Sequence, residues 1–288
     1  MKESVLLQGS AWRSCLFLLT AAMLLSATPA KGASWGTTDA GFFSNFGFTQ
    51  DWTVLQLGTN PVSVTSANVS GNFGVAGSTN LTVSKSSLDN LYLNSNATIH
   101  KTVTQTGIQK TITTNLNPDI TAGTNASNYF QSLSNSPVST WTSSNAFLSS
   151  KLELGPTNGS LNLSNASLTL TATSTTPVVF NISSFCLSSA SLTLSGSAND
   201  EFVFNIYGGT MSLTSSSIHL TGGLTPSDVV FNYVGAGGSG PAMSKNSSIS
   251  GIILSTQHSV TVANSSVTGA VISKGLTLSN ANIESPDN

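Results

Sequence analysis

The chain has 288 residues, of which 39% are hydrophobic and only 7% are charged, and its formal net charge is −2 at pH 7. This length is enough for one large domain or two small ones. The charged fraction is far below the usual quarter, while apolar residues alternate with Ser, Thr and Asn at a period of two. The pattern predicts a packed β protein with weakly charged polar faces and disfavours a disordered chain.

Residues 1–33 resemble a secretory signal peptide. Lys2 and Arg13 supply the positive region, an apolar run extends from Cys15 to Leu25, and small residues allow cleavage after Ala30 or near Ala33. The apolar run is too short to span a bilayer. We therefore expect a protein that is secreted, either extracellular or at the cell surface, and that has no transmembrane segment after cleavage.

Cleavage would leave a mature chain with one cysteine, Cys186, and no arginine. A single cysteine excludes an internal disulfide. The few lysines form no basic patch, and without a guanidinium the chain lacks the usual groups that read bases or clamp phosphates. We expect no nucleic-acid partner and no cofactor, and the sequence indicates no oligomeric state.

Residues 34–52 form an aromatic lead-in to the repetitive part of the chain. Its large apolar side chains are Phe42, Phe43, Phe46, Phe48 and Trp52. We predict an N-terminal cap that folds over the end of the next domain and covers its apolar edge. A binding role for these aromatic residues is the alternative.

Residues 53–288 carry a hexapeptide that repeats along the chain. It reads apolar, two small polar residues, Ala or Ser, Ser or Asn, apolar. The copies are Val64–Val69, Val83–Leu88, Leu163–Leu168, Leu187–Leu192, Leu213–Ile218, Val262–Val267 and Leu278–Ile283. Pairs of short strands joined by a small-residue corner predict a right-handed β-solenoid, which belongs to the mainly β class.

A second repeat places Phe before Asn in three successive copies. The pairs are Phe180-Asn181, Phe204-Asn205 and Phe231-Asn232. Coils about 4.8 Å apart would stack the phenylalanines inside and the asparagines at a turn, with amides bonded to one another and to the backbone. The shorter step from Val262 to Leu278 predicts final coils that lose one side or cap the stack.

The strand pattern breaks at about residues 118–150. Helical spacing of apolar residues, ended by a proline, predicts a helix packed along the flank of the solenoid, and a second short helix is expected after it. The first helix would carry Ala126, Tyr129, Phe130 and Leu133 before Pro137, and the second would carry Trp141, Phe147 and Leu148.

Several stretches resemble a known family. They are Val69–Val75, Leu91–Leu93, Gly222–Asn232, Ile249–Leu254 and Val267–Ile272. Over residues 54–284 the chain is similar to the bacterial extracellular domains called choice-of-anchor A, and its order of coils, helix and further coils is similar to bacterial ice-binding β-solenoids. The resemblance implies an exported, surface-displayed domain. Family members often end in a sorting tail, which this sequence lacks, so whether and how the protein is anchored stays open.

Catalytic signals are weak. His100, His219 and His258 are far apart and at no metal-ligand spacing, so we expect no metal site. Glu201 and Asp228 occupy the same place in the repeat, and a pair of carboxyls is what glycosidase chemistry needs. We expect both at an exposed turn, where no burial would raise a pKa, and therefore expect no enzyme.

One face presents a candidate for ice binding. Between the inward apolar residues of three coils, outward pairs would stack into a small lattice of hydroxyls and methyls. The residues are Thr169, Thr171, Thr193, Ser195, His219 and Thr221. Any Ser- and Thr-rich solenoid would show such a ladder, and His219 interrupts this one.

The sequence therefore favours an exported, non-catalytic structural or adhesive protein that binds through a repetitive neutral face. An ice-binding protein using the Thr/Ser ladder is the alternative, and a polysaccharide-active enzyme is less favoured. The expected partners are extracellular matrix, a cell-surface polymer or ice.

Overall fold

A computed structural model describes residues 41–104, 107–134, 140–143, 159–172, 177–235 and 237–285. The predicted signal peptide, Pro137, Phe147 and Leu148 lie outside the described residues. Within those ranges, no helix is both long and apolar enough to cross a membrane.

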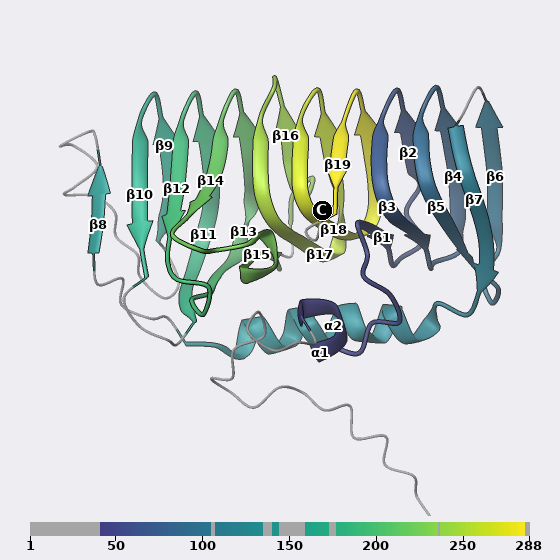
Figure 1. Cartoon of the computed structure of the whole chain (residues 1–288), viewed down its shortest axis with the longest axis horizontal. Coiled ribbons are helices and arrows are strands. Elements are labelled where there is room, and N and C mark those ends of the chain that lie inside the picture. Colours follow the sequence, from purple (N-terminus) through teal and green to yellow (C-terminus); the bar gives the residue numbers. More distant parts are fainter. Residues whose placement is uncertain are drawn as a thin grey trace, which may run out of the picture.

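The chain folds as a β-solenoid of about nine coils, which confirms the predicted fold class (Figure 1). Neighbouring coils pair through parallel strands, as in the ladder between β11 and β13, where Val178 pairs with Phe202 and Leu187 with Leu213. The strands form because inward apolar residues alternate with outward polar ones. In β12, for example, Leu192 and Leu194 are buried between half-exposed neighbours.

Two groups of coils make up the stack. The N-terminal arm contains β1 (Val54–Gln56), β2 (Val62–Thr65), β3 (Asn68–Val75), β4 (Thr79–Ser84), β5 (Ser87–Asn94), β6 (Ile99–Thr104) and β7 (Gly107–Thr114). The C-terminal arm contains β9 (Ser160–Ser164), β10 (Ser167–Thr171), β11 (Val178–Ser188), β12 (Ser191–Ser195), β13 (Phe202–Thr214), β14 (Ser217–Thr221), the 3-10 helix η2 (Pro226–Asp228), β15 (Val229–Tyr233), β16 (Ala242–Ser244), β17 (Ser248–Ala263), β18 (Ser266–Ser279) and β19 (Asn282–Glu284).

The order of the coils along the stack differs from their order along the chain. The N-terminal arm begins in the middle of the stack and runs to one end, while the C-terminal arm begins at the other end and returns to the middle (Figure 1). There β1 and β2 pair with β18, and β3 pairs with β19. We call this junction the seam. The prediction for the final coils is wrong, because β17 and β18 keep all three sides of the cross-section and lie inside the stack.

Each coil has three sides. One, the helix-covered face, carries β1, β15, the first parts of β11 and β13, the middle parts of β17 and β18 and the last parts of β3, β5 and β7. The second polar face carries β2, β4, β6, β9, β16 and the last parts of β11, β13, β17 and β18. The first polar face carries β10, β12, β14, β19 and the first parts of β3, β5, β7, β17 and β18.

The hexapeptide forms the corner between the two polar faces. Its third residue adopts a positive φ near 50°, as in Asn165 and Asn264, and Ser, Asn and Lys take this position. The fourth residue is always Ala or Ser and is buried, as are Ala166 and Ser265. A larger side chain would not fit where the chain turns inward so sharply.

The interior contains the expected ring ladder. The centroid of Phe204 lies 4.7 Å from that of Phe180 and 5.1 Å from that of Phe231, and all three rings are nearly parallel. The same row continues through Ile253 and Val271, so apolar contact is unbroken up to the seam.

Helix α2 (Asn117–Ser132) runs along the helix-covered face, parallel to the axis of the stack (Figure 1). Its placement is set by the asparagine ladder, which lies within β11, β13 and β15 rather than at the predicted turn. The amide nitrogens donate in sequence to the carbonyl oxygens of helix residues: Asn232 to Ser127 (3.1 Å), Asn205 to Phe130 (2.7 Å) and Asn181 to Leu133 (3.2 Å). Three helical residues rise about 4.5 Å, close to the coil spacing of about 4.8 Å.

Short helix α1 (Gly41–Asn45) brings the lead-in against α2. Phe42 stacks on Phe130 with ring centroids 6.1 Å apart, and Phe46 contacts Tyr129 and Phe130. The lead-in therefore covers the flank, and the prediction that it folds over the end of the solenoid is wrong.

The described part of the second predicted helix is a strand, and Phe147 and Leu148 lie outside the described residues. Trp141 lies in β8 (Thr140–Ser143), which pairs antiparallel with β10 at the end of the stack. The unpaired edge of β10 offers backbone hydrogen bonds that outweigh the short helical pattern.

Candidate binding faces

The second polar face carries two adjacent rows of outward, uncharged side chains. One residue of each coil contributes to a single row that crosses the whole stack and the seam. In spatial order the row is Asn162, Cys186, Ser212, Ala242, Thr261, Thr277, Ser63, Thr82 and Thr102. Every member is half-exposed or exposed, and none is charged.

A parallel row lies two residues further along each strand. Its members are Ser164, Ser188, Thr214 and Ser244 in one segment, and Ala263, Ser279, Thr65, Ser84 and Thr104 in the other. The described register shifts fall outside both rows, as between Ser255 and Ser259. Small, uncharged side chains thus repeat at about 4.8 Å across strands and at about 6.6–6.8 Å along them.

The first polar face holds the six residues singled out in the sequence, and their register is as expected. Thr169 pairs with Thr193, which pairs with His219, while Thr171, Ser195 and Thr221 form the adjacent row. The backbone of β8 extends this sheet by one strand, since Thr142 pairs with Thr169. The structure aligns these residues, but does not test whether they bind a ligand.

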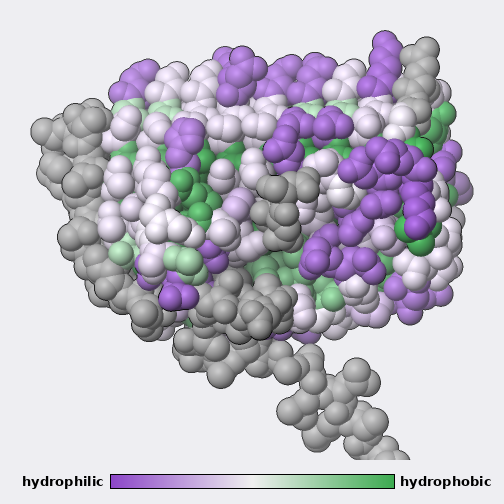
Figure 2. All heavy atoms as spheres, in the orientation of Figure 1, coloured by the Kyte–Doolittle hydropathy of each residue, from purple (hydrophilic) through white to green (hydrophobic). Residues whose placement is uncertain are grey.

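The remainder of the first polar face is irregular and charged. Asp89 accepts hydrogen bonds from the backbone of Gly71 and from Gln109, and Glu284 accepts one from Asn282. Figure 2 shows this side of the molecule, with strongly hydrophilic side chains gathered over the coils of β3, β5 and β7. One uncharged row still crosses this whole face, from Ser167 through Ser191, Ser217, Ser248, Ser266, Asn282, Asn68 and Ser87 to Gly107. The row beside it contains His219 and Glu284, so a uniform lattice of two adjacent rows does not extend over this face.

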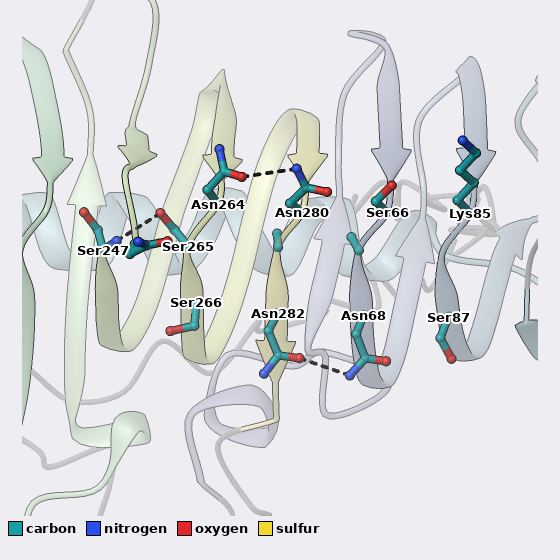
Figure 3. Close-up of a pocket in the computed structure, with 13 residues that line it drawn as sticks. Ser66, Asn68, Lys85, Ser87, Ser247, Asn264, Ser265, Ser266, Asn280 and Asn282 are labelled. Atoms are coloured by element: carbon teal, nitrogen blue, oxygen red, sulfur yellow. Dashed lines mark hydrogen bonds between the residues drawn. The ribbon is translucent and has the colours of Figure 1, made fainter.

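A groove of about 740 Å³ follows the corner between the two polar faces and crosses the seam (Figure 3). Its floor consists of the small fourth residues of the hexapeptides, including Ser247, Ser265 and Ala281. Asparagine amides bridge coils along its walls, with Asn280 donating to Asn264 at 3.1 Å and Asn68 donating to Asn282 at 3.0 Å.

The predicted carboxylate pair is buried, which corrects the expectation of an exposed turn. Glu201 is 1% exposed and Asp228 is 2% exposed. Asp228 accepts hydrogen bonds from the backbone N–H (2.7 Å) and the hydroxyl (2.8 Å) of Thr225, so it closes η2 as a capping box. Burial raises the pKa of Asp228, and the two bonds from Thr225 oppose that rise. This geometry is that of a structural carboxylate.

The histidines lie apart. His258 lies 2.6 Å from the carbonyl oxygen of Gly235 through Nε2 and packs edge-on against Tyr233, while His100 and His219 are exposed on different faces. Among the described residues, no three His, Cys, Asp or Glu side chains gather in a way that could hold a metal ion. Cys186 is a half-exposed free thiol in the second polar face.

Residues 50–285 match the family described as "Putative Ice-binding-like adhesive domain", and the chain belongs to this family. Comparison with curated protein sequences found no match.

Among solved structures, an ice-binding protein from an Antarctic bacterium of the Flavobacteriaceae is similar, with a TM-score of 0.50 and 14% identity over 82% of this chain and 45% of that one. The match thus spans less than half of that protein. Two others are an ice-binding protein from an Arctic yeast (TM-score 0.46, 17% identity, 82% and 91% coverage) and one from the Antarctic ascomycete Antarctomyces psychrotrophicus (TM-score 0.47, 12% identity, 83% and 96% coverage).

Sequence reasoning missed the second polar face. The signal was present, because a polar residue lies between two apolar ones before each corner, as in Val62-Ser63-Val64 and Leu276-Thr277-Leu278. These two segments are neighbours only because the seam brings them together. In the sequence, where the spatial order of the coils is not known, the residues of this row appear only as short separate segments.

Proposed function

We propose that this domain is an exported, non-catalytic adhesive module that binds ice through its second polar face. The observation that carries the proposal is the uncharged row from Asn162 to Thr102, one residue per coil across the full stack, together with the second uncharged row beside it. Membership of an ice-binding-like adhesive family and the names of the structural neighbours support it.

The physical basis is an ordered surface that hydrates weakly. Ice offers a rigid lattice of hydrogen-bonding sites without charge, so a face that matches it needs regular hydroxyls and methyls and gains nothing from ions. Paired parallel strands fix the backbone beneath each residue, so the face is organised before it binds and little entropy is lost on contact. On the first polar face an uncharged row also crosses the whole stack, but the row beside it contains His219 and Glu284.

The test is partitioning of the purified mature chain into a slowly growing ice hemisphere. Thr277 lies exposed near the middle of the second polar face, and Thr193 lies at the middle of the three-coil ladder on the first. We expect Thr277→Tyr to lose most of its enrichment in ice and Thr193→Tyr to keep it. Both substitutions are on the surface, so both should change the unfolding free energy by less than about 0.5 kcal/mol.

The opposite pattern, with binding lost only in Thr193→Tyr, would place the site on the first polar face. Exclusion of the unmodified chain from ice would remove ice as the ligand. The adhesive role would then be tested on extracellular matrix and cell-surface polymers.

A further inference from the structure

The seam differs from the other coil junctions in its connectivity. Within each arm the chain passes directly from one coil to the next, whereas at the seam it pairs residues far apart in sequence, such as Val54 with Val271 and Val69 with Ile283. Among the described residues, no strand continues from one arm into the other at this junction. The arms are linked in sequence by α2 and the residues after it, and α2 runs along the helix-covered face (Figure 1).

The bonds across the seam are those of an ordinary coil junction. Leu57 donates its backbone N–H to Ser273 (2.7 Å), and Asn68 donates its side-chain amide to Asn282 (3.0 Å; Figure 3). The core row is continuous across it because Val54 and Val271 are both fully buried. If the seam opened, two sheet edges with matching register and an exposed apolar core would result.

Such edges are complementary to a second copy of the same chain. The edge of β18 and β19 in one molecule presents the same pairing positions to β1, β2 and β3 of another as it does to its own.

Folding order supports the same conclusion. Coils within an arm pair residues close in sequence, and such contacts form early, whereas the seam requires closure of a long loop. Partly folded chains therefore expose both seam edges while their arms are already formed. A second molecule then competes for an edge at a rate proportional to protein concentration.

We propose that the seam is an exchange joint, at which the N-terminal arm of one chain pairs with the C-terminal arm of a second copy to give a dimer of two composite solenoids. The proposal concerns the coil junction and is independent of the ligand of either polar face.

The test is refolding from denaturant at low and high protein concentration, followed by size-exclusion chromatography with light scattering. Cys186 is replaced by Ser throughout. We expect the dimer fraction to rise with refolding concentration and the dimer to persist after dilution, since its dissociation requires an arm to detach. A chain that remains monomeric at every concentration would overturn the proposal.

Two disulfide variants share the same cysteine at position 282. Asn68→Cys with Asn282→Cys closes the seam, while Ser266→Cys with Asn282→Cys joins neighbouring coils within the C-terminal arm. Paired residues on adjacent parallel strands lie within the range that a disulfide spans.

Both variants are oxidised as native monomers and then unfolded and refolded at high concentration without reductant. We expect the seam-linked chain to stay monomeric and the arm-linked chain to dimerise as the parent does. Equal dimerisation of both would show association through another surface and would overturn the exchange joint. Reduction of the seam-linked chain should restore the parental dimer fraction.

Discussion

Where the fourth residue of the hexapeptide is Ser, its buried hydroxyl bonds to the backbone of two neighbouring coils. Ser216 donates its hydroxyl to the carbonyl of Thr214 (2.8 Å) and accepts the backbone N–H of Ala190 (3.1 Å) from the neighbouring coil. Ser86 makes the corresponding bonds to Ser84 and Ala67. The hydroxyl thus satisfies backbone groups of two coils at a corner where the regular ladder is interrupted.

Ser216→Ala should lower the unfolding free energy by about 1–3 kcal/mol, because the buried N–H of Ala190 is left without an acceptor. Urea unfolding at equilibrium measures the change. Ser217→Ala is the matched control, since Ser217 is half-exposed and its hydroxyl donates to the Ser191 hydroxyl (3.4 Å) and to no buried backbone group. A loss as large in the control as in Ser216→Ala would contradict the bridging role.

Asp228 should make stability depend on pH. Burial raises its pKa in the folded state above the ordinary value of 3.8. The folded chain therefore binds the proton more tightly than the unfolded chain, so stability is greatest below pH 3.8 and falls as pH rises through the folded pKa. The slope is at most about 1.4 kcal/mol per pH unit between the two pKa values.

Comparison with Asp228→Asn isolates this effect, since Asn keeps an oxygen that accepts from Thr225 but does not ionise. The unfolding free energy of the parent minus that of the variant should decrease from pH 3 to pH 6, as followed by urea titrations. A constant difference would show that burial and the bonds from Thr225 cancel, and a difference that increases with pH would show that hydrogen bonding to the charged form dominates.

At the scale of elements, α2 is held to the sheet by polar bonds. Asn205 donates to both the carbonyl of Phe130 (2.7 Å) and the side chain of Asn181 (2.9 Å), and it accepts from Asn232 (2.8 Å). The polar atoms of the Asn205 side chain are buried and hydrogen-bonded, so Asn205 is the central residue of the asparagine ladder that holds α2 to the sheet.

Asn205→Ala should loosen the helix more than the coils. It removes the donor to Asn181 and the acceptor for Asn232, at a cost of about 1–3 kcal/mol or more. Native-state hydrogen exchange should be faster at the amides of α2, with little change in the N-terminal arm. Thr210→Ala, on the exposed part of the same strand, serves as the control. Uniform acceleration in both arms would show that α2 and the solenoid open as one unit.

The terminal coil of the N-terminal arm limits the stack through its polar residues. The inward row Leu276, Val62 and Leu81 continues in register to Lys101, and the row of Leu91 continues to Thr111. Lys101 and Thr111 are both exposed. Inward-pointing charge is one of the ways in which proteins prevent pairing at an open sheet edge.

Lys101→Leu should therefore cause concentration-dependent self-association, detected by light scattering, because it completes an apolar row at an unpaired edge. Lys110→Leu is a matched control, since Lys110 belongs to the same coil but pairs with Asn90 on the first polar face. Similar association in both variants would attribute the effect to overall charge loss instead of the edge.

The elements themselves could be predicted because their signals are local. The alternation of apolar and polar residues predicted which side chains point inward. The small residues at the corners, which adopt a positive φ, marked the turns, and the spacing of Ala126, Tyr129 and Phe130 indicated α2. Burial of Asp228 and the strand at Trp141 could not be predicted in the same way. The first depends on η2 packing against β17 and β18, and the second on the free edge of β10.

At the scale of the whole molecule, the order of the coils was the main property that the sequence did not reveal. Each coil edge repeats the same apolar and hydrogen-bonding pattern, so the pairing rules are nearly the same for any two coils. β18 lies beside β1 because α2 carries the chain from the end of the N-terminal arm back along the stack, so that the C-terminal arm begins at the opposite end. The second polar face, whose rows cross the seam, was hidden for that reason.

The distribution of charge over the whole molecule provides the final prediction. On the second polar face, the described outward residues of both rows are uncharged, whereas the first polar face carries Asp89, Lys110, His219 and Glu284. Salt screens interactions between charges and leaves contacts between neutral groups nearly unchanged. Adsorption to polycrystalline ice should therefore be the same at about 10 mM and about 200 mM salt.

Glu284→Gln should leave that adsorption unaltered at both concentrations, because Glu284 lies off the proposed binding face. Adsorption that weakens strongly with salt, or that changes with Glu284→Gln, would show that charged groups of the first polar face take part and would argue against the neutral rows as the sole contact.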